Sequence, residues 1–431
     1  MYRNRRFAGI GLLLLFACAQ TPSPPPPAQG RFVRTWWSPS RREGNPATSN
    51  RVNTRVLPVQ FRDRPEAKAT NQVTIRVDEE IALLDGAELY LELWGGHPGT
   101  ARKRFSLNGQ GSYEIPEVGT AAGNCTFSYP SIPLDLAHLK RGDNVFEFSC
   151  EQGTSFWGHF LFEVAAVKVF LKGDHPDLRA SGLDSFHVDV SAQRQVGSAE
   201  RLLLSVEGPP RDLSRIDTVD YEARYRGFDE NGDGETTDWH GFTKQKLPVA
   251  ILGTSGTPPF EGAWDLAMVP DQEGMAVRAR VSLKQGNGLV YETAPAGGLS
   301  TAPRDRVEVT LHGTRDLPHP FWSRASRLQR CTIELPEDPG DIERAELHVV
   351  IWDGGRGSTE RPFMLNGHEL AVTGEGRHDV LYRVVGIDPS WLRRGPNLIE
   401  VLSDTEHHGI EVLLPGPALV VRSRIRKTIE K

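Results

Sequence analysis

The chain has little of what usually marks an enzyme or a helical protein. Its 431 residues include only 4 cysteines and 4 methionines, against 43 glycines and 31 prolines. That balance is typical of a turn-rich β protein poor in helix formers. The formal net charge of -6 is mild for this length, so charge gives no indication of nucleic acid or of an acidic ligand as a partner.

Local catalytic motifs are missing as well. The sequence contains no Gly-x-Ser-x-Gly elbow, no His-Glu-x-x-His pair, no phosphate-binding glycine loop and no dinucleotide fingerprint. Carboxylates are plentiful, as in any soluble protein, and none of them stands out. An acid pair for glycoside hydrolysis therefore stays open.

Residues 1–17 have the layout of an export signal. Arg3, Arg5 and Arg6 precede an apolar run over 10–16, which is too short to span a bilayer and ends at Ala17-Cys18. This segment resembles a bacterial lipobox, which implies that Cys18 becomes the lipidated first residue of the mature protein. An ordinary signal peptide or a short membrane anchor is the alternative.

Residues 18–55 are expected to form a tether and linker. Residues 21–29 are nearly all proline and small residues, which favours a stiff, extended spacer. Residues 31–55 are polar and arginine-rich, which indicates a linker or a strap packed on a later domain. By the lipobox resemblance, Ala19 implies sorting to the outer membrane. No later stretch is apolar enough to cross a membrane, so the rest is expected to be exported, soluble and attached to the membrane only through its lipid.

One sequence pattern occurs twice. Val73–Gly109 aligns without a gap with Cys331–Gly367, and after a small change of register 139–147 aligns with 392–400. A period this long, present twice, predicts two separate domains and excludes a solenoid, because each copy is large enough to close its own core.

Each copy runs through a strand, a tryptophan, a glycine-rich loop, an Asn-Gly turn, one helical turn, Arg-Gly-x-Asn and a further strand. In this order each copy resembles the galactose-binding-like jelly roll found beside many bacterial glycan-degrading enzymes. The resemblance implies that Leu139 and Leu392 plug the two cores, and that Asn144 and Asn397 each support a turn.

We therefore predict an all-β chain of three β-sandwich domains. The expected divisions are a jelly roll over 56–175, an immunoglobulin-like sandwich over 176–302 and a second jelly roll over 303–425. Short runs of strand-forming residues separated by Gly, Pro, Asn and Asp support this division.

The expected state of the cysteines follows from the predicted export of the protein. In an oxidising compartment, Cys125 and Cys150 of the first copy are expected to form a disulfide, which stabilises by about 3 to 4 kcal/mol on the chain-entropy estimate. Cys331 aligns with Val73 at an apolar strand position, and we expect a small buried hydrophobe there.

An acidic loop over 229–240 is the sharpest local motif. Oxygen side chains at its first, third and fifth positions precede a glycine, as in the calcium loop of an EF-hand. The candidate ligands of a structural calcium ion are Asp229, Asn231, Asp233, Glu235 and Asp238. Position twelve departs from the EF-hand because it is His240, and the flanking segments are expected to be strands. The alternative is a solvated acidic turn whose glycines supply positive φ angles.

A second group of candidates lies in loops where such jelly rolls bind ligands, since tryptophan faces stack on sugar rings while histidine and aspartate orient hydroxyls. These candidates are Trp94, His97, Trp157, His159, Trp352, Asp353, His407 and His408. Trp94 and Trp352 also continue an alternating strand, so core packing is the alternative for both. His407 and His408 lack the further ligands of a metal site and fit a solvated loop.

These features favour a lipid-anchored, non-catalytic envelope protein that presents carbohydrate-binding or adhesive β-sandwich domains. Its expected partner is a polysaccharide or other glycan, with an envelope protein as a further possibility. The alternatives are a glycan-processing enzyme, of the tandem jelly-roll amidase or glycosidase type, and a purely structural protein-docking module.

Overall fold

The described chain is built almost wholly from antiparallel strands. The computed structural model describes residues 29–38, 50–53, 71–96, 100–116, 127–152, 159–232, 234–240, 243–244, 247–248, 252–302, 304–318, 321–322, 327–353, 361–372, 379–402 and 410–425. Within these ranges the helices are short: α1 (Pro176–Ala180), α2 (Pro210–Leu213), η4 (Ile81–Leu83), η5 (Pro339–Asp341) and η6 (Pro389–Trp391). The predicted all-β fold with β-sandwich domains is confirmed.

The first copy of the repeat folds into two facing sheets. One sheet has the order β3 (Gln72–Val77), β9 (Gly142–Gln152), β5 (Thr100–Leu107) and β6 (Gln110–Glu114). The other is formed by β4 (Leu84–Trp94) and β10 (His159–Leu171), with β7 (Phe127–Ser128) and β8 (Ser131–Leu134) at the edge of β4. Leu89, Phe105 and Phe146 are fully buried between the sheets.

The second copy repeats this strand order. One sheet contains β24 (Gln329–Leu335), β29 (Gly395–Leu402), β26 (Arg361–Leu365) and β27 (His368–Glu369). The other contains β22 (Val307–Gly313), β31 (Ala418–Arg424), β25 (Ile342–Asp353), β30 (Ile410–Val412), β23 (Phe321–Trp322) and β28 (Asp379–Ile387). Leu139 and Leu392 are buried at corresponding positions, as predicted, and Cys331 is free and buried. Burial raises the pKa of Cys331 to about 12, which fits its predicted role as an apolar residue.

A pair of asparagines closes the same turn in each copy. The amide of Asn108 donates to Oδ1 of Asn144 at 2.9 Å, and that of Asn366 donates to Oδ1 of Asn397 at 2.8 Å. Asn144 and Asn397 are fully buried, and each bonds the backbone of its own turn through both its oxygen and its nitrogen. Their predicted role as turn supports is confirmed.

The segment between the copies forms another pair of facing sheets. One contains β11 (Asp189–Arg194), β12 (Arg201–Glu207) and β18 (Gly262–Asp265). The facing strands are β13 (Ile216–Arg226), β14 (Thr237–His240), β17 (Thr254–Ser255), β19 (Met275–Leu283), β20 (Leu289–Glu292) and β21 (Ala296–Leu299). A separate two-stranded pair is formed by β15 (Thr243–Lys244) and β16 (Leu247–Pro248).

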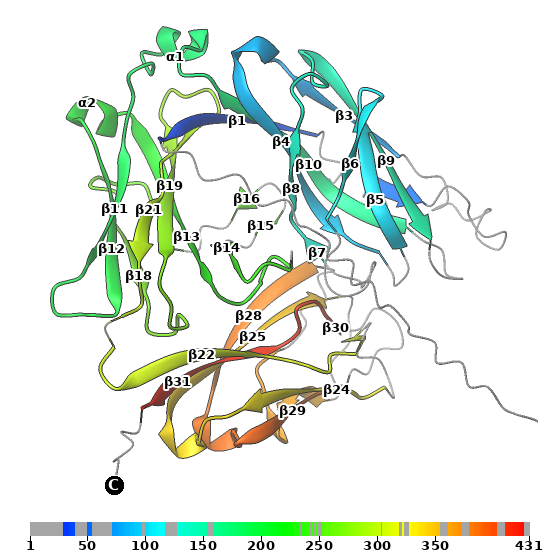
Figure 1. Ribbon diagram of the computed structural model, residues 1–431, viewed down its shortest axis with the longest axis vertical. Coiled ribbons are helices and arrows are strands. Elements are labelled where there is room, and N and C mark those ends of the chain that lie inside the picture. The colour runs from blue at the N-terminus through cyan, green and yellow to red at the C-terminus, as the bar shows by residue number, and fades with distance from the viewer. Residues whose placement is uncertain are drawn as a thin grey trace, which may run out of the picture.

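Strand β1 (Arg31–Trp37) joins the first copy to the middle sandwich. It pairs antiparallel with β10 on one side and with β20 on the other, while β2 (Asn50–Asn53) extends β10. These pairings merge the sheets into one of twelve strands, in which β14-β13-β19-β20-β1-β10-β4-β7 follow one another. Figure 1 shows β1, in dark blue, running between the β13–β19 group and the β4–β10 group. The segment that the sequence left as linker or strap thus contains an inner strand.

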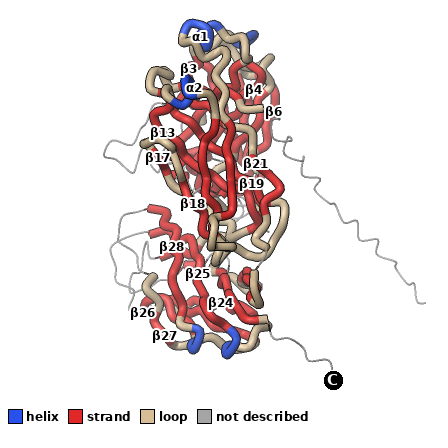
Figure 2. Tube along the Cα trace, turned by 90° about the vertical axis from the view of Figure 1, so that its left-hand side faces the viewer, coloured by secondary structure: helices blue, strands red, loops and turns tan. Residues whose placement is uncertain are grey.

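The second copy lies at the other end of an elongated molecule (Figure 2). It contacts both other parts: Trp352 stacks on Phe127 with ring centroids 5.4 Å apart, and Tyr382 stacks on Phe228 at 5.7 Å. Arg422 also pairs with Glu200 of the middle sandwich at 2.5 Å. These contacts place the β13–β14 loop against the second copy.

In the described part of the chain, no helix has the length and apolar character needed to cross a membrane. The export signal, Cys18 and the proline-rich segment lie outside the described residues, so their predicted roles remain predictions.

Candidate functional site

The twelve-stranded sheet has one apolar face and one polar face. Alternate residues such as Leu89, Val167 and Ala279 face the sandwich cores. The intervening residues share the opposite face, and the register places them side by side across strands from both sandwiches. We call this the polar face; its members are Arg31, Trp37, Glu88, Tyr90, Glu92, Trp94, Lys168, Glu222, Trp239, Arg278, Arg280 and Glu292.

Glu222 and Arg278 form the tightest ion pair of the polar face. They are partners in the β13–β19 register, and Nε and Nη2 of Arg278 lie 2.7 and 2.6 Å from Oε2 of Glu222. The guanidinium also stacks over Trp239, 4.2 Å from the ring centroid. Stacking and a charge-assisted pair together hold the indole in a fixed orientation.

Glu292 is surrounded by cations. Arg31 Nη2 lies 3.4 Å from its Oε2, and Arg280 Nε lies 3.9 Å from its Oε1. Burial raises the pKa of Glu292, but the positive charges of Arg278, Arg280, Lys168 and Arg31 outweigh burial and lower it overall. The carboxylate is therefore ionised at neutral pH.

Lys168 faces this group from the other arm of the sheet. Burial is the main cause of its lowered pKa, and the charge of Arg280 lowers it further, against the opposing charges of Glu292 and Glu88. In the register, Lys168 pairs with Thr35, whereas Glu292 pairs with Arg31, four residues away along β1.

Aromatic side chains flank the charges. Trp37 meets Tyr90 edge to face at 6.5 Å, the Tyr90 hydroxyl donates to Glu92 at 3.1 Å, and Lys168 Nζ lies 5.2 Å above the Tyr90 ring. Trp37, Trp94 and Trp239 are each only half-buried. Rigid strands thus present aromatic planes beside ionised groups, which is the composition of a site for a polar ligand with apolar faces.

Two predicted ligand-binding residues lie at the end of this face. Trp94 is half-buried, and its ring lies 5.4 Å from that of His159, which is buried. Trp352 of the second copy instead has one face covered by Phe127. Asp353 ends β25 and its side chain is not described; His97, Trp157, His407 and His408 lie outside the described residues. A ligand role for these residues stays a prediction.

The acidic loop connects β13 to β14, so it lies on a hairpin of strands as expected. Asp229 is buried and its Oδ2 accepts a hydrogen bond from the backbone N–H of Gly234 at 2.9 Å; Asn231 donates to Asp238 at 3.2 Å. Gly232 and Gly234 have positive φ angles of 66° and 88°. Glu235 is exposed, and Asp233 lies outside the described residues. The predicted calcium site is thus described without one of its ligands and remains a prediction.

His240, at position twelve of this loop, serves a different purpose. Its Nδ1 donates to Glu230 at 2.7 Å and its Nε2 donates to the Tyr225 carbonyl at 2.7 Å. A carbonyl oxygen can only accept a hydrogen bond, so Nε2 carries a proton. Burial alone lowers the pKa of His240, but the hydrogen bond and charge of Glu230, together with the Tyr225 carbonyl, raise it above its ordinary value. This buried pair holds the base of the loop.

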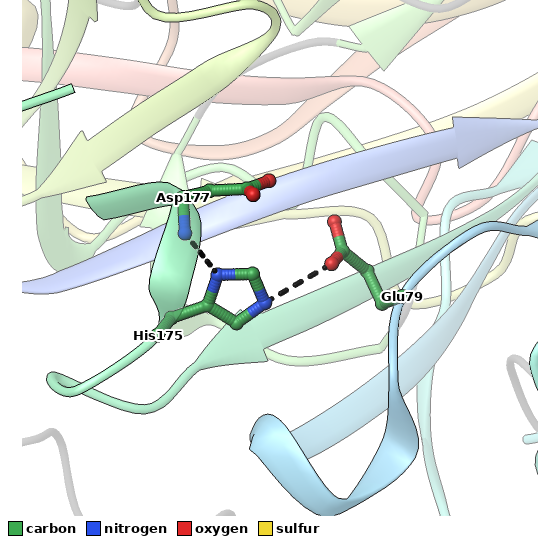
Figure 3. A group of neighbouring side chains, drawn as sticks. All are labelled: Glu79, His175 and Asp177. Atoms are coloured by element: carbon green, nitrogen blue, oxygen red, sulfur yellow. Dashed lines mark hydrogen bonds and ion pairs between the residues drawn. The ribbon is translucent and has the colours of Figure 1, made fainter. Parts of the chain in front are cut away.

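A histidine and two carboxylates meet where β1 crosses the end of the first copy (Figure 3). Glu79, His175 and Asp177 form the one group among the described residues with the spacing of a metal site. His175 Nδ1 accepts from the Asp177 N–H at 3.2 Å, so its Nε2 carries the proton and faces Glu79 at 3.1 Å. Arg34 contacts both carboxylates. With a guanidinium in contact with both carboxylates, the group fits an ionic latch better than a cation site.

The predicted disulfide is only half described. Cys150 is buried on β9, with its Sγ 3.5 Å from the Val52 carbonyl, while Cys125 lies outside the described residues. The bond stays a prediction.

Sequence reasoning missed the charged centre of the polar face. The only signal is alternation, with Arg278 and Arg280 separated by an alanine within a strand. The same alternation is typical of any solvated strand face, so it did not distinguish these residues.

No family model matches the chain, and no curated protein matches it. Among solved structures it overlaps with BpGH86A, a β-porphyranase of glycoside hydrolase family 86 from Bacteroides plebeius, at a TM-score of 0.24 and 13% identity over 56% of this chain and 37% of that chain. BuGH86 in complex with neoagarooctaose overlaps at 0.23 and 10% identity, over 56% and 34%. The glycoside hydrolase domain of Endo-D from Streptococcus pneumoniae R6 overlaps at 0.23 and 11% identity, over 54% and 32%. The chain thus spans about a third of the length of each of these proteins, and TM-scores this low do not indicate a shared architecture.

Proposed function

We propose that this protein is a lipid-anchored, non-catalytic protein of the bacterial cell envelope, and that it binds a glycan on the polar face of its twelve-stranded sheet. The anchor is the predicted lipidation at Cys18, with sorting to the outer membrane. Calcium in the acidic loop has a structural role, and an envelope protein is a possible further partner.

One observation carries the glycan proposal: half-buried aromatic rings and ionised side chains share one rigid face. Trp37 and Trp239 provide planes for the apolar side of a sugar ring. Arg278 provides charged donors for hydroxyls beside the Trp239 ring. Because all three lie on paired strands, the geometry is fixed before a ligand arrives, which limits the entropy lost on binding.

Binding is favoured over hydrolysis by the state of the carboxylates. A glycosidase needs one carboxyl group with a raised pKa to act as the acid. Glu292 has a lowered pKa, so it is not suited to deliver a proton.

A glycan array probed with the labelled full-length protein tests this proposal. We expect binding by the wild type and a loss of about tenfold in affinity for Trp239→Ala, an ordinary cost for removing one stacking aromatic residue. Trp391→Ala is the matched control, because Trp391 stacks on His368 in the second copy, away from the polar face. A blank array, or equal losses in both variants, refutes the proposal, and cleavage of a bound glycan favours the enzyme alternative.

A further inference from the structure

Two of the half-buried tryptophans of the polar face lie far apart on the sheet. Trp239 is on β14 and Trp37 is on β1, with β13, β19 and β20 between them in the strand order. Four strand intervals of about 4.8 Å separate the two residues across the sheet, a distance of about 19 Å. A ligand of one or two sugar units can therefore stack on one of these rings but cannot reach the other.

The strand register adds a second separation, along the strands. Across β13, Trp239 shares a row with Ala276 of β19. Across β20, Arg31 of β1 shares a row with Arg280, four residues further along β19. Trp37 lies six residues beyond Arg31, and β1 runs in the same direction as β19 because both are antiparallel to β20. The two offsets therefore add, and although sheet twist shortens the direct path, the tryptophans lie at opposite ends of a diagonal across the polar face.

Three guanidinium groups follow this diagonal. Arg278 stacks over Trp239, Arg280 lies two residues further along β19, and Arg31 shares the row of Arg280 on β1. The side chains of Arg278, Arg280 and Arg31 are 25%, 18% and 33% exposed, so a ligand can reach each of them from solvent. Arg280 forms no hydrogen bond in the described chain and has only ion contacts of 3.8 and 3.9 Å, which leaves N–H donors for hydroxyl groups.

The cations along the diagonal are balanced by carboxylates. In the strand register each cation lies opposite at least one of them: Arg278 opposite Glu222, Arg280 opposite Asp220 and Glu292, Arg31 opposite Glu292, and Lys168 opposite Glu88. Arg224, opposite Trp239, is exposed to water. A charge-balanced face has no surplus of either sign with which to attract an ionic sugar, whereas its guanidinium and carboxylate groups can donate to and accept from uncharged hydroxyls.

We propose that the polar face binds an internal stretch of a neutral polysaccharide, about four or more sugar units long, which runs from Trp239 over the arginines to Trp37. This inference rests on the proposed glycan binding and adds the length and the charge class of the glycan. A pyranose unit is close to one strand interval in length, so about four units cover the distance across the sheet. Once one end of such a chain has stacked, its contact with the second tryptophan is intramolecular, which raises the affinity for a long chain above that for a short one.

Titration calorimetry with oligosaccharides of two, four and six units tests the inference. The neutral series come from β-1,4-glucan, β-1,4-mannan, xylan and β-1,3-glucan, together with any further neutral glycan that the array identifies; oligogalacturonates of the same lengths form the charged series. The proteins are full-length wild type, Trp37→Leu, Trp239→Ala and the control Trp391→Ala, whose lost ring stacks on His368 of the second copy. Leucine keeps an apolar side chain against Tyr90, and melting temperatures show whether each variant is folded.

We expect the tightest series to be neutral and its six-unit member to bind at least tenfold more tightly than its two-unit member, with little dependence on salt. Trp37→Leu and Trp239→Ala should each lower the affinity for six units toward that for two units, while Trp391→Ala keeps the difference.

Three results would overturn the inference and leave the proposed glycan binding in place: equal binding of two and six units, tighter binding of the charged series or of a charged array glycan, or a length dependence that survives in both tryptophan variants. The wild-type length series needs no variant, so it decides the matter even if Trp37→Leu does not fold. If no sugar binds here or on the array, the proposed function fails together with this inference.

Discussion

Replacing Lys168 with methionine should make the protein more stable at neutral pH. Methionine keeps the length of the side chain but removes a half-buried ammonium group whose pKa is lowered by burial and by the charge of Arg280. Replacing buried charges with apolar groups of similar volume often stabilises by about 1 to 4 kcal/mol. The lost contact with the Tyr90 ring opposes this by about 0.5 to 1 kcal/mol.

The expected net gain in the free energy of unfolding is therefore about 1 to 2 kcal/mol, or roughly 2 to 6 °C in melting temperature. The gain should depend on pH in one direction. Because the pKa of Lys168 is lowered in the folded protein, the unfolded chain binds more protons between that pKa and the ordinary value of about 10.4. Wild-type stability thus rises with pH relative to the variant, and the gap narrows from pH 7 toward pH 10.

Urea unfolding of the wild type and Lys168→Met at pH 7, 8.5 and 10 measures this directly. Lys172→Met is the control, because its exposed amine should change stability by less than about 0.5 kcal/mol at any of these pH values. A variant that is less stable than the wild type at pH 7, or a gap that does not change with pH, would refute the reasoning that the surroundings of Lys168 disfavour its charged form.

Three further outcomes are expected. His240→Gln should lower the free energy of unfolding by about 2 to 4 kcal/mol because it leaves Glu230 buried without its cation. Since the pKa of His240 is raised, the loss measured by urea unfolding should be full below about pH 6.5 and should shrink as pH rises through the folded pKa. A loss that grows with pH would contradict the His240–Glu230 pair. Glu79→Gln should lower the free energy of unfolding by about 2 to 4 kcal/mol by leaving Arg34 and His175 without their shared carboxylate. Zinc should not raise the melting temperature of the wild type. Stabilisation by zinc that Glu79→Gln abolishes would instead make this group a metal site. Calcium added to the metal-stripped protein should raise the melting temperature of the wild type but not of an Asp229→Ala, Asp233→Ala double variant, and no calorimetric binding would reduce the loop to a solvated turn.

The sequence predicted the features that depend on neighbours along the chain. The alternating segments became strands, the Asn-Gly turns took positive φ at Asn108 and Asn366, and Cys331 took a buried strand position. The match between the two copies predicted their common strand order because it compared the chain with itself.

Features that depend on distant pairing could not be predicted in this way. Trp36-Trp37 in an arginine-rich segment gave no sign that β1 would pair with residues near 170 and near 290, because pairing partners leave no local pattern. The charged centre of the polar face was missed for the same reason. Lys168 and Arg280 share one face only because β1 joins two sheets, so neither residue is distinguished within its own strand.

The insertion of β1 also determines how this molecule would respond to force. For a chain held at its N-terminal end, a pull directed along β1 reaches the fold through a strand that is bonded on both sides. Such a pull shears many backbone hydrogen bonds at once, whereas a pull on an edge strand opens them one after another. The strand that joins the two sandwiches would thus resist detachment under load, and its rupture would expose both cores together.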